Sequence, residues 1–149
     1  MTFWFYAVIV VLIDQISKYF ALKYLNYSVS YTVLAPILFF TRIHNRGAAF
    51  GIMSGSVIVF IIFSFLVIAL FLIFQKKILS LEKSIQICLG LVMGGCIGNL
   101  IDRIRFNYVV DFIDFKVWPV FNFADSALTL SVTYLIIYFI VLDIKDRKR

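Results

Sequence analysis

Four long apolar stretches, over residues 3–25, 57–74, 84–101 and 126–142, restrict this chain to few folds. A bilayer core of about 30 Å is crossed by about 20 mostly apolar residues in a helix, so each stretch qualifies as a membrane span. Hydrophobic residues make up 63% of the chain, well above their share in soluble globular domains. The sequence therefore predicts an all-α membrane protein with four transmembrane helices, in a single domain over residues 1–149.

Charge and cysteine usage argue against two other classes of function. The net charge of +6 could indicate a nucleic-acid binder, but the basic residues cluster beside the apolar stretches and build no base-reading face. Cys88 and Cys96 would lie roughly 12 Å apart on one helix, too far for a disulfide. With the single histidine, His44, they make no plausible zinc site. We expect no nucleic-acid partner, no metal and no cofactor.

The basic clusters also predict the orientation in the membrane. Four spans place both termini and the loop between the second and third spans on one side. Basic residues gather there, as they do at cytoplasmic helix ends: Lys76, Lys77, Lys83, Lys145, Arg147, Lys148 and Arg149. The opposite side carries a nearly balancing set: Arg42, Arg46, Arg103, Arg105 and Lys116. We predict cytoplasmic termini and expect the outer arginines to have a specific task.

The segment between the first two spans, about 28–55, has a different pattern. It begins with alternating polar and apolar residues, continues with β-formers, and reaches a turn at Asn45-Arg46-Gly47. We expect a small extracytoplasmic β-rich segment there, resting on the membrane. In the third span, glycines at every fourth position predict close packing against another helix: Gly90, Gly94 and Gly98.

Acidic residues at membrane depth are functional candidates, because each costs about 2.5–3.5 kcal/mol on insertion scales. Three of the eight acidic residues lie beside basic residues at cytoplasmic helix ends, where solvation explains them: Glu82, Asp143 and Asp146. The other five are Asp14, Asp102, Asp111, Asp114 and Asp125. All but Asp14 gather at the outer ends of the third and fourth spans, which favours a site at the membrane surface.

Asn99, Asp102 and Arg103 share one helix face at the end of the third span, because their offsets are zero, three and four. This polar patch has two interpretations. It is either a salt bridge with an amide at a helix end, or a cradle in which a guanidinium and an amide hold a peptide backbone. The spacing alone does not choose between them.

Asp111 and Asp125 stand among apolar and aromatic residues without an adjacent base. Asp125 lies where the fourth span begins, so an N-cap is its alternative role, and the helix dipole would favour its ionised form. The apolar setting of Asp111, and a second carboxylate nearby, would raise the pKa of its carboxyl. Such a pair can share one proton, so that the ionised member activates water while the protonated member polarises a scissile carbonyl. This is the chemistry of aspartyl proteases.

Five motifs occur in order along the chain: Asp14-Gln15-Ile16-Ser17-Lys18, His44-Asn45-Arg46-Gly47-Ala48-Ala49-Phe50, Gly98-Asn99-Leu100-Ile101-Asp102-Arg103, Val109-Val110-Asp111-Phe112 and Phe121-Asn122-Phe123-Ala124-Asp125-Ser126. Over its whole length the chain resembles the lipoprotein signal peptidases (signal peptidase II). The resemblance implies a bacterial inner-membrane aspartyl endopeptidase with its active site at the outer face. It would remove signal peptides from diacylglyceryl-modified prolipoproteins by cutting before the lipidated cysteine. Its partners would be these precursors and membrane lipid, and we expect a monomer.

The resemblance also implies roles for individual residues. The catalytic dyad would be Asp111 and Asp125; the substrate site would be lined by Asn45, Asn99, Arg103 and Asn122; structural support would come from Asp14, Lys18 and Asp102. Arg46 departs from the family, which often has Thr after the asparagine, and the connection over 112–124 is short. Two other functions stay open: a small transporter or ion channel that uses intramembrane aspartates, and a non-catalytic assembly protein.

Asp111 and Asp114 share one segment, and composition does not choose between them. In an extended segment, residues at an odd offset point to opposite faces, so only one of the two would face Asp125. In a helix both would share a face. The resemblance selects Asp111, and the valines at 109 and 110 favour an extended chain. We expect Asp114 to have a solvated partner in Lys116.

Overall fold

The computed structural model describes residues 1–47 and 56–147. Its elements are α1 (Thr2–Tyr24), β1 (Ser30–Leu34), β2 (Leu38–Asn45), α2 (Val57–Ile73), α3 (Gln75–Ile78), α4 (Lys83–Phe106), β3 (Val109–Asp114) and α5 (Phe123–Asp146). Two parts of the sequence-based predictions lie outside the described residues. These are positions 48–55 of the β-rich segment, which include Ala48-Ala49-Phe50 of the second motif, and Lys148 and Arg149 of the basic tail.

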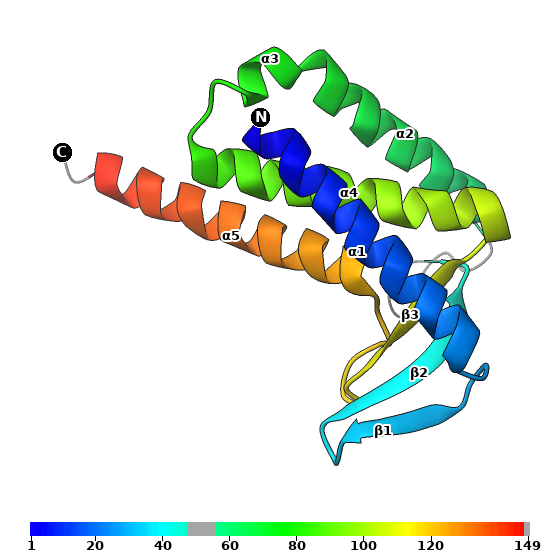
Figure 1. Ribbon diagram of the computed structural model, residues 1–149. Coiled ribbons are helices and arrows are strands. Elements are labelled where there is room, and N and C mark those ends of the chain that lie inside the picture. Colours follow the sequence, from blue (N-terminus) through cyan, green and yellow to red (C-terminus); the bar gives the residue numbers. More distant parts are fainter. Residues whose placement is uncertain (48–55, 148–149) are drawn as a thin grey trace.

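The helices form a bundle in which α4 packs against α1, α2 and α5. Figure 1 shows the sheet at one end of this bundle and both chain termini toward the other end. Helices α1, α4 and α5 are long and apolar enough to cross a membrane. Helix α2 is apolar but has 17 residues, about 26 Å at about 1.5 Å per residue, which is near the lower limit for a span. The protein is mostly helical, with three to four apolar helices.

Glycines let α1 and α5 rest directly on α4. A Cβ atom at Gly94 would lie 2.6 Å from the carbonyl oxygen of Ala7 in α1, closer than real Cβ atoms come. On the neighbouring face, a Cβ atom at Gly95 would lie 2.8 Å from the carbonyl oxygen of Ala124 in α5. The close packing that the glycine spacing predicted is confirmed, and it brings the outer parts of three helices within reach of one another's side chains.

The sheet is antiparallel, in the order β1–β2–β3. Strands β1 and β2 lie in the segment where the sequence predicted β structure. The third strand was not predicted as part of the sheet, although its valines did indicate an extended chain. In the β2–β3 register, Asn45 lies opposite Val109 and Ile43 lies opposite Asp111. This pairing carries Asp111 from the end of α4 to the strand that holds Asn45.

Two turns place the start of α5 beside β3. Helix α4 continues past the predicted end of its span at 101 to Phe106, and Asn107 then turns the chain with a left-handed backbone (φ 59°), a conformation that asparagine tolerates. After β3, a short loop returns so that Phe121 pairs with Ile113: the Ile113 N–H donates to the Phe121 carbonyl at 2.8 Å. Helix α5 therefore begins at Phe123, earlier than the predicted 126, with Asn122 as its N-cap.

Candidate active site

Asp111 and Asp125 meet at the end of the bundle that carries the sheet. Asp111 lies in the middle of β3 and is completely buried. Asp125 lies in the first turn of α5 and is partly exposed to a cavity of about 510 Å³. One carboxylate is thus presented by a buried strand and the other by the open end of a helix.

Three asparagine side chains connect the two carboxylates. Asn45 Nδ2 donates to Asp111 Oδ2 at 2.9 Å, and Asn122 Nδ2 donates to Asp111 Oδ1 at 2.7 Å. Asn99 Nδ2 donates to Asp125 Oδ1 at 2.8 Å. Asn122 Nδ2 also donates to Asn99 Oδ1 at 3.1 Å, which closes the connection. The asparagines expected around a substrate are therefore hydrogen-bonded to the dyad, while Asn45 and Asn99 also line the cavity.

The environment of Asp111 favours its protonated form. Burial and, next, the charge of Asp125 raise the pKa of the Asp111 carboxyl to about 7. Hydrogen bonds from Asn45 and Asn122 act in the opposite direction, because they stabilise the carboxylate. Asp125 lies in the first turn of α5, where the helix dipole favours negative charge. The two carboxyls therefore have different environments, as an acid and a base near neutral pH require.

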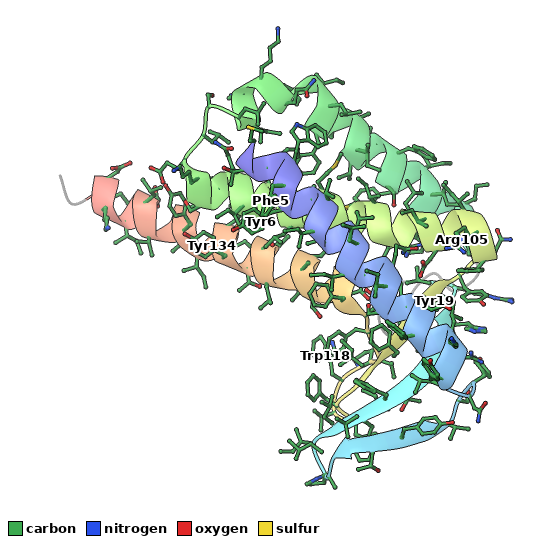
Figure 2. The ribbon with its side chains drawn as sticks, in the orientation of Figure 1. Phe5, Tyr6, Tyr19, Arg105, Trp118 and Tyr134 are labelled. Atoms are coloured by element: carbon green, nitrogen blue, oxygen red, sulfur yellow. The ribbon has the colours of Figure 1, made fainter. Side chains whose placement is uncertain are left out.

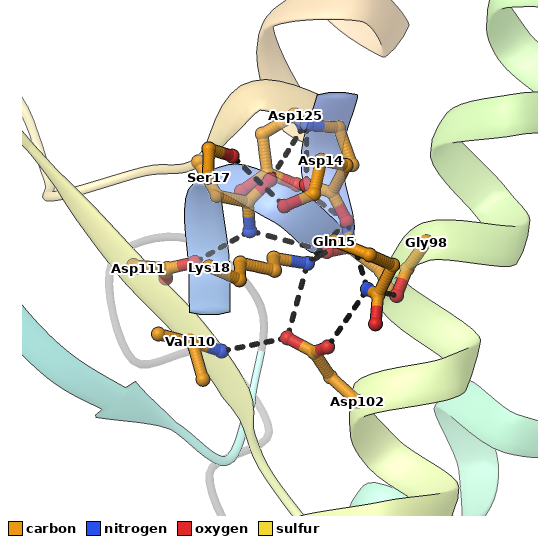
Figure 3. A network of polar contacts seen from close by, with 12 residues as sticks. Asp14, Gln15, Ser17, Lys18, Gly98, Asp102, Val110, Asp111 and Asp125 are labelled. Carbon is orange, nitrogen blue, oxygen red and sulfur yellow. Dashed lines mark hydrogen bonds and ion pairs between the residues drawn. The ribbon is translucent and has the colours of Figure 1, made fainter. Parts of the chain in front are cut away.

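A buried ion-pair network lies behind the dyad (Figure 3). Lys18 Nζ is 2.8 Å from Asp14 Oδ2, one turn away in α1, and 3.0 Å from Asp102 Oδ2 in α4. It also donates to Asn99 Oδ1 at 3.0 Å. The three charged side chains are at most 2% exposed. The Asp102–Arg103 salt bridge that was one interpretation of the polar patch is not observed, since the cation beside Asp102 is Lys18.

The two carboxylates of this network also hold the two segments that carry the dyad. Asp14 Oδ1 accepts the backbone N–H of Ala124 in the first turn of α5 at 3.0 Å. Asp102 Oδ2 accepts the backbone N–H of Val110, next to Asp111, at 3.0 Å. The ion pairs between α1 and α4 thus position β3 and α5 as well.

Gln15 contributes to this network, and the sequence analysis gave it no role. Its Nε2 lies 3.2 Å from Asp14 Oδ2, 3.2 Å from the Gly98 carbonyl and 3.1 Å from Asp102 Oδ1. A Cβ atom at position 98 would lie 2.5 Å from Asp14 Oδ2, so only glycine leaves room there. The sequence did contain a signal for this role, because Gln15 is an amide inside an apolar span and is adjacent to Asp14.

The outer arginines differ in their relation to the cavity. Arg103 lines it, with its guanidinium 5.0 Å from the centre of the Phe60 ring and Nη1 3.5 Å from the Asn99 carbonyl oxygen. Arg46, the departure from the family pattern, is exposed and is not among the residues that line the cavity. The rest of the lining is largely apolar and comes from the loop before α5 and from the first turns of that helix: Trp118, Pro119, Val120, Phe121, Leu128 and Leu130.

Asp114 is separate from the dyad, and its partner Lys116 has a solvated side chain (43% exposed), as expected. The side chain of Asp114 itself is buried (4% exposed) and accepts hydrogen bonds from Thr41 Oγ1 at 2.6 Å and Lys116 Nζ at 2.7 Å. Although burial alone would raise it, these hydrogen bonds hold the pKa of the Asp114 carboxyl below its usual value. Lys116 is its partner, as expected, and both carboxylate oxygens are engaged within the sheet and its following loop.

No group of three or more His, Cys, Asp and Glu side chains that could hold a metal ion occurs within residues 1–47 and 56–147. The carboxyl pair itself offers general acid and base chemistry on a bound carbonyl and a water molecule.

The family model for signal peptidase (SPase) II matches residues 6–141. The chain belongs to the signal peptidase II family. Because this is a family of proteases, the protein is a hydrolase with apolar membrane helices.

Relatives of known sequence or structure agree with this membership. The lipoprotein signal peptidase of Halothermothrix orenii is 42% identical over 130 residues, which cover 87% of this chain and 89% of that protein. The lipoprotein signal peptidase of Caldanaerobacter subterraneus subsp. tengcongensis is 43% identical over 127 residues, covering 85% and 87%. A solved bacterial membrane enzyme is similar with a TM-score of 0.85 and 34% identity, covering 97% of this chain and 90% of that one.

Asn122 has two functions that substitutions can separate. Its Oδ1 caps α5 by accepting the Asp125 N–H at 2.9 Å, while its Nδ2 donates to Asp111. Asn122→Ala should lower the free energy of unfolding by about 1 kcal/mol through loss of the cap. Asn122→Ser keeps a capping oxygen and should unfold near the parent temperature, yet lose as much peptidase activity. Thermal unfolding in detergent, paired with a cleavage assay, measures both. Full activity in the serine variant would contradict the role of the Nδ2 donor.

Proposed function

We propose that this signal peptidase II family member is an aspartyl endopeptidase of the bacterial cytoplasmic membrane, with Asp111 and Asp125 as its catalytic dyad. It cuts diacylglyceryl-modified prolipoproteins just before the lipidated cysteine. One observation carries the proposal: two carboxyls in unequal environments are joined by amide donors beside a cavity, and one of them has a pKa raised to about 7. The names of the relatives, lipoprotein signal peptidases, support the substrate class.

The unequal environments suggest how the dyad divides the work. Asp125, which lines the cavity, acts as the ionised base and takes a proton from water as the water oxygen attacks the scissile carbonyl carbon. Asp111 carries the shared proton and polarises the carbonyl oxygen, which becomes a hydroxyl of the tetrahedral intermediate. Breakdown of the intermediate breaks the C–N bond, transfers a proton to the leaving nitrogen and leaves the dyad with one proton for the next cycle.

The shape of the cavity fits a substrate that arrives from the bilayer. Its lining combines the polar groups Asn45, Asn99 and Asp125 with exposed apolar side chains. Leu130 of α5 is 70% exposed and Trp118 is 60% exposed, and Figure 2 places Trp118 in the loop between α5 and the sheet. A lipidated residue held by these apolar side chains would present the preceding peptide bond to the dyad, and its remote binding energy would help to position that bond.

The bundle supports four spans with the dyad at the outer membrane surface. The sheet and the dyad occupy one end of the bundle, while the termini and the basic loop residues belong to the other (Figure 1). Under the positive-inside rule the basic end is cytoplasmic. The acidic residues at the sheet end also make an ion path across the bilayer a poor fit, because they gather at one surface.

Topology can be tested with fusions. A reporter that is active only in the cytoplasm should work when fused after Arg149 or at Lys77, since both positions lie at the basic end. The same reporter fused near Ser30, at the start of β1, should be silent, whereas a periplasmic reporter should work there. Cytoplasmic reporter activity at Ser30 would invert the proposed orientation.

The dyad assignment is tested by three matched substitutions. Asp111→Asn and Asp125→Asn should each abolish cleavage of a lipidated precursor while the protein still inserts and accumulates. Asp114→Asn should retain most of the activity, because that carboxylate contacts Thr41 and Lys116 and no member of the dyad. Cleavage per folded enzyme is measured side by side, with an unlipidated precursor as a control that should be cut far more slowly. A dead Asp114→Asn beside a live Asp111→Asn would show that the dyad is misassigned.

The pH dependence follows from the protonation of Asp111. The proposed acid must keep its proton, so kcat/KM should fall as the pH rises through about 7. At low pH it should fall again as the base becomes protonated, and a metal chelator should have no effect. Asn45→Leu removes a hydrogen bond that lowers the pKa of Asp111, so the alkaline limb of this variant's residual activity should move to higher pH. An alkaline limb that stays in place would contradict the assignment of the acid.

A further inference from the structure

The ammonium of Lys18 is fully occupied. Its three N–H groups match three acceptors: Asp14 Oδ2 at 2.8 Å, Asp102 Oδ2 at 3.0 Å and Asn99 Oδ1 at 3.0 Å. The side chain is 2% exposed and is not among the residues that line the cavity. Lys18 therefore has neither a free N–H nor access to a substrate, so it acts on the reaction through these three partners and through its positive charge, which reaches both Asp111 and Asp125.

Of the three partners, Asn99 is the one that contacts the dyad. Its Oδ1 accepts from both Lys18 Nζ and Asn122 Nδ2, at 3.0 and 3.1 Å. If the carboxamide were turned over, its NH2 group would face the ammonium and a second NH2 group. Two opposed pairs of donors in a buried site are unfavourable, because none of them has an acceptor. The ammonium thus fixes Asn99 with its Nδ2 toward Asp125 Oδ1, at 2.8 Å.

The same constraint extends to Asn122. The oxygen of this side chain is held by the Asp125 N–H, so its two N–H bonds point to Asn99 Oδ1 and Asp111 Oδ1. Asn99 Oδ1 can accept the first of these bonds because the carboxamide oxygen of Asn99 is turned toward Lys18 and Asn122. The chain of hydrogen bonds that begins at Lys18 therefore ends with one amide donor on each catalytic carboxyl.

The structural ties beside Lys18 are made by hydrogen-bond donors other than its ammonium. Asp14 Oδ1 holds the Ala124 N–H, Asp102 Oδ2 holds the Val110 N–H, and Gln15 bridges both carboxylates. We propose that Lys18 is a positioning residue of the peptidase reaction: it sets the orientation of the Asn99 carboxamide, and so the amide donors that align Asp111 and Asp125. This inference rests on the proposed function of the dyad.

The experiment compares Lys18→Met with the parent enzyme on a lipidated precursor. Loss of one aligned donor on the dyad should lower kcat about a hundredfold. KM should change less than kcat, because Lys18 itself does not line the cavity. Lys23→Met is the matched control: Lys23 lies on the same helix, is exposed, and contacts only the rings of Tyr19 and Tyr24 among the interactions described. The control should keep the parent kcat.

A double variant tests whether Lys18 acts through Asn99. Lys18→Met combined with Asn99→Ala should be slower than Asn99→Ala alone by much less than a hundredfold, because the positioning effect of Lys18 passes through Asn99. Losses that multiply would overturn the proposal. So would a folded Lys18→Met enzyme with a kcat close to that of the parent.

A charge-neutral double variant serves as the control for misfolding. Lys18→Met leaves two buried carboxylates without their cation, so Lys18→Met/Asp14→Asn removes one charge of each sign and keeps an oxygen for the Ala124 N–H. Each variant's thermal unfolding is measured, and the charge-neutral double variant should fold and show the same loss of kcat. If neither variant folds, Lys18 is an assembly residue and the positioning role is wrong. If Asp111→Asn is active, the proposed dyad itself fails, whatever Lys18 does.

Discussion

Lys18 places its ammonium between Asp14 of its own helix and Asp102 of α4, in a site closed to solvent. Removing one member of such a buried pair typically costs about 3–5 kcal/mol, because the remaining charge is left without compensation. The ion pair between Lys18 and Asp102 therefore fixes the position of α1 along the axis of α4. Through their other hydrogen bonds the same carboxylates hold the first turn of α5 and the residue before Asp111. The two elements that carry the dyad, β3 and α5, are thus both held at this point.

The two catalytic candidates, Asp111 and Asp125, differ in burial because one lies in a strand and the other in the first turn of a helix. A strand inside a small sheet can bury a carboxyl completely, since neighbouring strands and the returning loop cover it, and Asp111 has no exposed surface. The first turn of α5 lies beside the cavity, so Asp125 keeps contact with the cavity and with the favourable helix dipole. A strand and a helix end that meet at one spot thus give two aspartates unequal environments.

Features set by local pattern were predictable from the sequence, and features set by distant pairing were not. The apolar stretches, the packing glycines and the one-turn spacing of Asp14 and Lys18 depend on neighbours along one helix. The sheet pairing of β3 depends on β2, and the burial of Asp114 depends on Thr41, 73 positions away. The early start of α5 depends on Asn122, whose capping oxygen becomes recognisable only once Phe121 is paired with Ile113. Gln15 needed the same long-range contacts, to Gly98 and Asp102.

The bond between Asp14 and the Ala124 N–H joins positions 110 residues apart, almost the two ends of the chain. During synthesis, the first helix leaves the ribosome long before the last one exists. Until the last helix docks, Asp111 has no second carboxyl with which to share a proton, and Asn99 has no carboxylate to which it can donate. No fragment that lacks either the first or the last helix contains a complete site. Within this architecture, the capacity to cut a peptide bond arises only with the finished bundle.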